Sequence, residues 1–195
     1  ASALTKDGIN ITYTEKQSDL NEENLRLYDG LIMYGNQEEI SHNEEKALLS
    51  FVENGNAFIP IHSASFCFKN SNEYIKLVGA QFKNLAPFKT WDETYVHDKI
   101  ADDITILMER VEGDHREPYT WVKEVGEGKV FYTAFGHDDR TWSNKGFQSL
   151  IKSGILWAVN KKVKKNWTAF MANMPILSYE ERANIPNYEK RDPAP

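Results

Sequence analysis

Three groups of polar side chains lie at the ends of apolar runs or between them. They are His62 and Ser63; Asp92, Glu93, Tyr95 and His97; and His137, Asp138 and Asp139. The first and third groups directly follow strand-like runs at 57–61 and 130–135. Imidazoles and carboxylates that converge on one place can hold a divalent metal ion or share general acid and base roles. The sequence predicts a site of this kind if one sheet brings the groups together.

Each of these side chains also has a purely structural interpretation. His62 could donate to a neighbouring carbonyl where its strand ends, and residues 137–139 could cap the following helix, with the aspartates at its positive end. Asp92 and Glu93 could be solvated loop charges, although the flanking aromatic residues favour partial burial. The sequence leaves both interpretations open.

The remaining histidines and the single cysteine are weaker candidates for functional-site residues. We expect a structural role for His97, a surface position for His115 in the turn predicted at 113–118, and solvent exposure for His42 after the helix cap. Cys67 lies between two phenylalanines, which favours a buried, unreactive thiol.

A parallel sheet would bring the strand ends together. The alternation at 9–14 predicts a half-buried strand, and the runs at 31–34 and 57–61 predict buried strands. Between the latter two, Ser41 and Glu44 have capping-box spacing and Gly55 marks the end of an amphipathic helix. Strand–helix–strand units of this kind indicate a parallel sheet covered on both faces. Ligands bind beyond the carboxyl ends of such strands.

The second half of the chain continues this pattern. It predicts a strand at 104–111, a hairpin at 119–137 and an amphipathic helix at 144–159. After residue 163 the periodicity fades, so we predict a domain at 1–163 and a tail or interdomain linker at 164–195. Residues 1–8 resemble the end of a helix, and no central strand precedes them, so the chain is expected to be a fragment or to lack the first strand.

Size and composition narrow the functional class. A chain of 195 residues with 41% hydrophobic and 27% charged residues suits one globular domain with a substantial core. A net charge of -6 argues against a nucleic-acid surface, and the lysines at 160–165 suit the end of a helix. No apolar run approaches a membrane span and no signal-peptide pattern is present. The single cysteine excludes an internal disulfide.

Several motifs, in fixed order, resemble the ThuA-like (trehalose-utilisation) family. They are YDGLIMY, EEKALLSFVENGNAFIPIHSAS, YIKLVGAQF, WDETYVH, EPYTWVKEVGEGKVFYTAFGHDDRTW and FQSLIKSGILWAV. The likeness runs from about Ile9 to Val159 and implies a class I glutamine amidotransferase-like, flavodoxin-like fold: an α/β three-layer sandwich with a mostly parallel sheet.

NITYT, CFKNS, WDETYVH and HREPYTWV are most similar to the ThuA-like module at the start of large exported bacterial proteins. In those proteins a dehydrogenase-like propeller and a c-type haem domain follow. This resemblance implies a periplasmic or secreted location, haem only in a downstream domain, and contact with those domains or with further copies of the chain.

The resemblance also bears on the chemistry. In glutamine amidotransferases the strand corresponding to 57–61 delivers a nucleophilic cysteine, whereas here His62 and Ser63 hold that place and Cys67 does not match it. His137 is similar to the catalytic histidine of that fold. Thioester chemistry is therefore not expected, and Ser63 as a replacement nucleophile would need a base within hydrogen-bonding reach. Family members carry further segments before Ala1 and before Trp91, often with histidines, so the metal ligands of this chain stay undetermined.

These observations predict a domain that acts on or binds a sugar or polyol in bacterial sugar catabolism. The residues assigned to catalysis are His62, His137 and Glu93. The residues assigned to substrate binding are Ser63, Asp92, Tyr95, Asp138 and Trp142. A divalent metal is compatible with this set, and no other cofactor is visible in the chain. The alternative is a non-catalytic docking or ligand-binding module of a larger redox protein.

Overall fold

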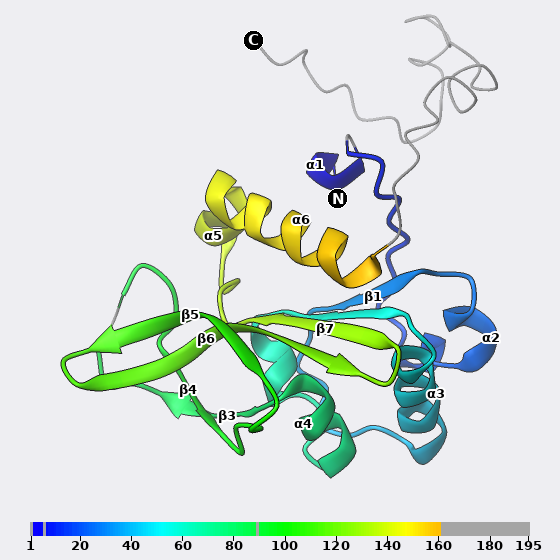
Figure 1. Cartoon of the computed structure of the whole chain (residues 1–195), viewed down its shortest axis with the longest axis horizontal. Coiled ribbons are helices and arrows are strands. Elements are labelled where there is room, and N and C mark those ends of the chain that lie inside the picture. The colour runs from blue at the N-terminus through cyan, green and yellow to red at the C-terminus, as the bar shows by residue number, and fades with distance from the viewer. Residues whose placement is uncertain (1, 6, 89, 161–195) are drawn as a thin grey trace, which may run out of the picture.

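A five-stranded sheet lies between two layers of helices in the computed structural model, which describes residues 2–5, 7–88 and 90–160 (Figure 1). The strand order is β1-β2-β7-β6-β5. The strands are β1 Gly30–Met33, β2 Ala57–Pro60, β5 Thr105–Glu112, β6 His115–Val125 and β7 Gly128–Thr133. A separate antiparallel ribbon consists of β3 Gln81–Leu85 and β4 Tyr95–Asp98.

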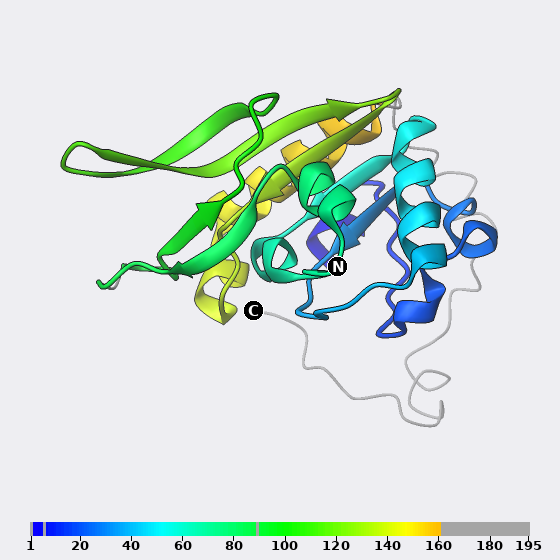
Figure 2. The same cartoon turned by 90° about the horizontal axis from the view of Figure 1, so that it is seen from below.

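The helices divide between the two faces of the sheet. Figure 1 shows α6, with the short α5 and α1 beside it, above the sheet, and Figure 2 shows α3 and α4 on the opposite face. The longer helices are α3 His42–Glu53, α4 Asn72–Val78 and α6 Lys145–Val159. The shorter ones are α1 Ser2–Thr5, η1 Gln17–Asp19, α2 Glu22–Leu25, η2 His62–Phe66 and α5 Asp139–Ser143. The predicted three-layer α/β fold is confirmed.

The sheet is mixed, and its parallel part positions the site. β1 pairs in parallel with β2, and β2 with β7, while β6 and β5 add antiparallel pairs. An isolated bridge joins Ile61, directly after β2, to Thr133, the last residue of β7. The carboxyl ends of the three parallel strands therefore lie side by side at one edge.

Continuous apolar strands form two cores because alternate residues face opposite helix layers. Phe58 and Tyr132 belong to the core under α3 and α4, whereas Ile59 and Phe131 belong to the core under α6. The α6 layer approaches closely at Gly154, where an added Cβ would lie 2.5 Å from Phe131 Cδ1.

The predicted capping box of α3 is present. The Ser41 hydroxyl accepts from the Glu44 backbone N–H, and the Glu44 side chain accepts from the Ser41 backbone N–H. The buried face of the helix comprises Ala47, Leu48, Phe51 and Val52. Local polar spacing and the apolar period thus specify this helix together.

Two sequence predictions about local structure were wrong. Residues 9–14 form no strand: Tyr13 is 79% exposed, and this alternating segment pairs with no strand among the described residues. The turn predicted at 113–118 is shorter, because His115 and Arg116 already pair with Glu112 and Val111 in the β5–β6 ladder. Alternation and turn-forming residues describe local preference, but a ladder needs a partner strand.

Two further points concern the limits of the domain and its surface. The predicted boundary at residue 163 and the tail at 164–195 lie outside the described residues. None of the helices in the described ranges has the length and apolar character needed to cross a membrane.

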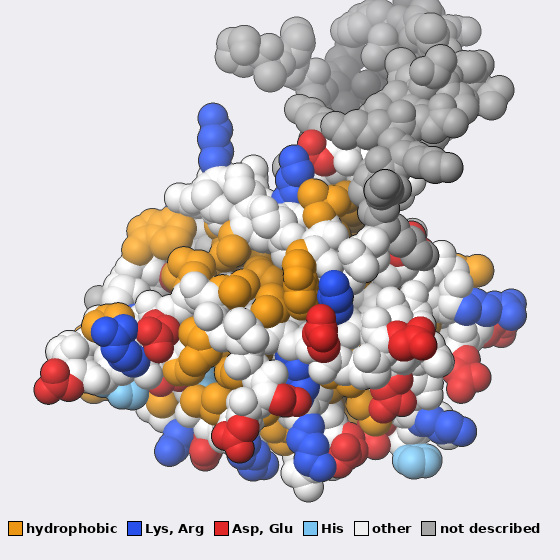
Figure 3. Space-filling model, viewed as in Figure 1, with side chains coloured by type: hydrophobic (Ala, Val, Ile, Leu, Met, Phe, Trp, Pro, Cys, Tyr) orange, Lys and Arg blue, Asp and Glu red, His pale blue; other side chains and the backbone are white. Residues whose placement is uncertain are grey.

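Strand β5 is an edge strand with exposed Ile106, Leu107 and Val111. Figure 3 shows hydrophobic side chains at the surface of the face that carries β5 and α6.

Candidate functional site

His62, Glu93 and His137 meet at the carboxyl edge of the parallel strands. Glu93 Oε2 lies 3.3 Å from His62 Nε2 and 3.3 Å from His137 Nδ1. The two imidazole rings are 5.7 Å apart between centroids, and the three potential ligand atoms lie within 4.8 Å of one another. The structure thus brings together the three residues that the sequence assigned to catalysis.

His62 is buried and its orientation is defined by the β7 end. Its backbone is left-handed, with φ of 51°, which is uncommon for a residue other than glycine. Its Nδ1–H donates to the Ala134 carbonyl at 2.7 Å, so in the neutral ring Nε2 is the nitrogen that carries the lone pair. Burial lowers the pKa of His62, although the Ala134 bond and the charges of Asp92 and Glu93 oppose that shift.

The turn that carries His137 packs directly on His62. Gly136 has φ of 137°, and an added Cβ there would lie 3.1 Å from the Cβ of His62. A glycine therefore permits this close approach. The His137 side chain itself is 45% exposed, so it is the most accessible member of the triad.

Asp92 joins the loop of Glu93 to the turn of His137. It is buried, and its carboxylate accepts from the backbone N–H of Glu93 at 2.7 Å and of Gly136 at 3.0 Å. It also accepts from the Thr141 hydroxyl at 2.7 Å. Asp92 was assigned to substrate binding, and its carboxylate already has three protein donors.

A cavity of about 450 Å³ opens beside the triad. Glu93 and His137 line it together with Phe88, Thr90 and Arg140. A mixture of an aromatic ring, a hydroxyl and charged groups is typical of small-molecule sites. The cavity places the exposed side of the triad within reach of a ligand.

Tyr95 and Trp142, two of the residues assigned to substrate binding, also lie at this edge. The Tyr95 ring stacks on His62 with centroids 4.5 Å apart, and its hydroxyl is 3.3 Å from His62 Nε2. Trp142 Nε1–H donates to the Gly136 carbonyl at 2.9 Å, and the residue is 36% exposed.

The other two residues of that set are less engaged. Asp138 caps α5 and pairs with Arg140 at 2.6 Å. These contacts are the ones expected if Asp138 has a structural role at the start of the helix. Ser63 follows His62 in η2, and within the part of the chain that the structure describes its hydroxyl makes no hydrogen bond to a base.

Cys67 is buried, as predicted. Its Sγ–H donates to the Gly35 carbonyl at 3.0 Å, and burial raises the pKa of the thiol to about 12. A thiol of this kind is almost fully protonated near neutral pH, so it is a poor nucleophile.

Residues 1–158 match the sequence model of ThuA, which is described as trehalose utilisation. The chain belongs to the ThuA family. No sequence among the curated proteins matches it.

Solved structures show the same fold at low sequence identity. A putative ThuA-like protein from Bacteroides uniformis is 20% identical, with a TM-score of 0.63 over 84% of this chain and 83% of that one. A putative ThuA-like protein from Parabacteroides merdae is 16% identical, with a TM-score of 0.59 over 81% and 79%. A cytoplasmic protein from Salmonella typhimurium is 13% identical, with a TM-score of 0.51 over 80% and 84%.

Sequence reasoning missed a buried polar chain behind the triad of this ThuA-family domain. His97 Nδ1–H donates to Glu117 at 2.9 Å, and His97 Nε2 lies 3.1 Å from the Tyr132 hydroxyl. That hydroxyl lies 3.1 Å from the His62 carbonyl. Tyrosines within apolar runs look like core residues, so no sequence signal distinguishes Tyr132 from its neighbours.

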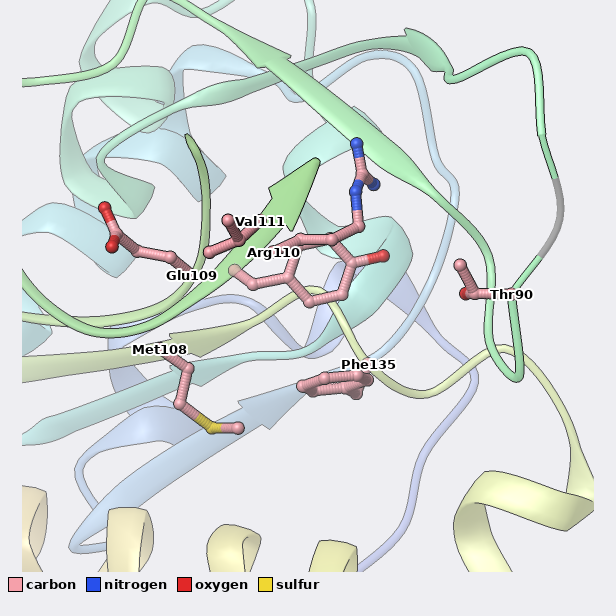
Figure 4. Close-up of a pocket in the computed structure, with 7 residues that line it drawn as sticks. Thr90, Met108, Glu109, Arg110, Val111 and Phe135 are labelled. Atoms are coloured by element: carbon pink, nitrogen blue, oxygen red, sulfur yellow. The ribbon is translucent and has the colours of Figure 1, made fainter. Parts of the chain in front are cut away.

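A second cavity, of about 310 Å³, is lined by Met108 to Val111 of β5 together with Thr90, Tyr119 and Phe135. Figure 4 shows the Arg110 guanidinium pointing away from Met108 and Phe135. That guanidinium donates to the Tyr95 carbonyl at 2.7 Å and pairs with Glu112. This cavity therefore presents mainly apolar groups and no set comparable to the triad.

Proposed function

We propose that this ThuA-family domain binds and acts on a sugar or polyol at the His62–Glu93–His137 triad, with a divalent metal ion held by those three side chains. The convergence of two imidazoles and one carboxylate beside an open cavity carries the proposal. The description of the family as trehalose utilisation supports the ligand class.

The donor set fits a metal such as zinc in type, and its two nitrogen–oxygen distances fit in spacing. Two ligand atoms that each lie about 2.0–2.1 Å from a tetrahedral zinc ion are about 3.3 Å apart. Both nitrogen–oxygen distances in the triad have this value, and they exceed the 2.7–2.9 Å typical of charge-assisted hydrogen bonds. The other ring nitrogen of His62 donates its N–H hydrogen to a backbone carbonyl, as metal-bound histidines usually do.

The chain's own residues would divide the work at such a site. A bound metal ion would act as a Lewis acid on a sugar oxygen. Phe88 offers an apolar surface to the ring carbons, and the Arg140 guanidinium offers N–H donors to hydroxyl groups. The Thr90 hydroxyl donates to the Asp92 carbonyl at 2.7 Å, so it offers a ligand an acceptor. His137, as the exposed imidazole, is placed to give or take a proton at a ligand hydroxyl.

Calorimetric titration with zinc, cobalt and trehalose tests this proposal. We expect the wild-type chain to bind cobalt, and we expect His62→Ala and His137→Ala each to weaken that binding more than tenfold, because each removes one of three ligands. His42→Ala changes an exposed histidine of α3 and serves as the control. Unchanged cobalt affinity in both triad variants would falsify the metal site.

Ligand binding without turnover is the second candidate, and two observations favour it. Among the described residues the Ser63 hydroxyl makes no hydrogen bond to a base, and burial keeps the Cys67 thiol protonated near neutral pH, so neither is an activated nucleophile. This candidate predicts that trehalose or a related sugar binds to the protein but is not converted. Its mass spectrum should stay unchanged after long incubation with the protein and metal. A new product that disappears in His137→Ala would support the enzyme instead.

A further inference from the structure

We propose that Tyr34, Tyr119 and Tyr132 are positioning residues of the triad. Each hydroxyl bonds to a backbone carbonyl in the segment that presents one triad residue. This proposal rests on the proposed function only for the metal ion that the triad would bind. The positions of the three triad side chains can be measured without a metal. The three tyrosines come from β6, β7 and the end of β1, far apart in the sequence.

Tyr119 holds the loop of Glu93. Glu93 lies between β3 and β4, outside any helix or strand, and the Tyr119 hydroxyl donates to its carbonyl. The same hydroxyl oxygen accepts from the Tyr95 backbone N–H at 3.2 Å. Among the described residues, this is the only hydrogen bond found for the Glu93 carbonyl. The Tyr119 ring is itself fixed by edge contact with Phe135, with centroids 4.8 Å apart.

Tyr132 holds the turn of His62 together with Ser65. Its hydroxyl lies 3.1 Å from the His62 carbonyl and 2.9 Å from Ser65 Oγ, while Ser65 Oγ lies 3.2 Å from the same carbonyl. A tyrosine has one hydroxyl hydrogen, and His97 Nε2 at 3.1 Å is a third acceptor for it. Where Tyr132 donates to Ser65 or to His97, the Ser65 hydroxyl is the donor to the His62 carbonyl, so that carbonyl has a hydroxyl donor in each arrangement. The Tyr132 ring stacks on Trp121 with centroids 4.1 Å apart, so it provides a fixed support.

Tyr34 holds the turn of His137. Its hydroxyl donates to the Gly136 carbonyl at 3.1 Å, directly before His137. Trp142 Nε1–H donates to that carbonyl as well, at 2.9 Å. The Tyr34 and Trp142 rings meet edge to face with centroids 5.4 Å apart.

The three tyrosine hydroxyls, which we call anchors, differ in whether a second side chain donates to the same carbonyl. We therefore expect their loss to weaken metal binding to different extents. The Glu93 carbonyl depends on one hydroxyl, whereas the His62 and Gly136 carbonyls each have a second side-chain donor. Outer partners of metal ligands typically change affinity by 10- to 100-fold when removed. Tyr119→Phe should therefore weaken cobalt binding about tenfold, and Tyr34→Phe or Tyr132→Phe alone by less than about threefold.

The closing experiment measures cobalt affinity of these variants by absorption spectroscopy and adds two controls. The double change of Tyr132→Phe with Ser65→Ala should weaken binding about tenfold, because it removes both hydroxyls at the His62 carbonyl. Tyr74→Phe is the matched control: Tyr74 is buried and its hydroxyl donates at 2.8 Å to the Ala64 carbonyl, which lies two residues after His62 in η2 and neither belongs to nor directly precedes a triad residue. Its cobalt affinity should equal that of the wild type even if its melting temperature falls.

A metal-free readout separates this inference from the proposed function. In the apo protein the His62 and His137 rings both contact Glu93, so their NMR ring signals report its position. Tyr119→Phe should shift or broaden both signals and leave that of His42 unchanged, whereas Tyr74→Phe should move none of the three. Wild-type protein that binds no cobalt, with these signal changes present, would overturn the metal site and retain the anchors. Unchanged triad signals in Tyr119→Phe, or equal changes in Tyr74→Phe, would overturn the anchors.

Discussion

Glu93 shows how a single carboxylate can give two separated histidines a common role. Its Oε2 is 3.3 Å from a nitrogen of each ring, while its backbone is held by Asp92 and Tyr119. The His62 ring is buried at 4% side-chain exposure, and Glu93 retains 27%. At the residue scale, therefore, the triad has a rigid inner member and an open side toward the cavity.

Glu117 allows a test of the buried pair behind the triad. Burial raises the pKa of Glu117, but hydrogen bonds from the His97 side chain and backbone outweigh it, and the pKa lies below its usual 4.5. A carboxylate with a lowered folded pKa stabilises the native state above its unfolded pKa. That contribution disappears as the pH falls through the lower, folded value.

We therefore expect Glu117→Gln to lower the unfolding free energy at pH 7 by about 2 kcal/mol, as for loss of hydrogen bonds to a charged group. The acid-induced loss of stability below about pH 4.5 should become shallower than in the wild type. Urea unfolding between pH 3 and 7 measures both, with the exposed Glu124→Gln as control. A variant with the same acid limb as the wild type would contradict this account.

At the scale of elements, the ends of β1, β2 and β7 place the site because their ladders are parallel and in register. Met33 pairs with Pro60, and the bridge between Ile61 and Thr133 continues that line. The segments that follow each strand therefore begin at the same height on the sheet.

Gly154 tests the packing of α6 on the sheet. Alanine in place of glycine usually stabilises a helix by about 1 kcal/mol. Here the added Cβ would lie 2.5 Å from Phe131 Cδ1, inside van der Waals contact, so Gly154→Ala should destabilise the protein by about 1–3 kcal/mol. Ser153→Ala, at the neighbouring exposed position of the same helix, should be neutral or slightly stabilising. Thermal unfolding of both variants decides, and a stabilised Gly154→Ala would show that the layers separate easily.

At the scale of the whole molecule, Asp92 connects parts of the chain that lie more than forty positions apart. It bonds the Glu93 loop, the Gly136 turn and Thr141 of α5 through one carboxylate. A buried carboxylate with three donors is well satisfied, so the link is rigid.

Asp92→Asn should loosen that link. The NH₂ group of the amide would replace one carboxylate oxygen and would face at least one N–H or O–H donor instead of accepting from it. This should cost about 2 kcal/mol of stability. Cobalt binding should also weaken, because Glu93 and His137 would lose their common support. Asp98→Asn is the control: Asp98 is exposed, and among the described residues its carboxylate accepts only from the backbone N–H of its neighbour Lys99. Calorimetry and urea unfolding measure both effects, and an Asp92→Asn protein as stable as Asp98→Asn would refute the link.

Much of the fold could be predicted from local patterns. The capping box at Ser41 and Glu44, the apolar run of β2 and the helix after Asn144 are all short-range features, and each forms as expected. The segment at 9–14 failed because alternation does not supply a partner strand. The groups at His62, Glu93 and His137 were recognisable because polar residues followed buried strands or lay in the connection between them.

The sequence by itself determined the three-layer fold, the family and the strand ends where chemistry could occur. It could not determine that Glu93, rather than Asp92, lies between the imidazoles, nor that Tyr34, Tyr119 and Tyr132 bond the backbone around them. Capping and apolar periodicity act between residues a few positions apart, so the sequence displays them directly. The contacts of these side chains join segments that are 26 to 102 positions apart, and only the packing of strands and loops in three dimensions decides which of them meet.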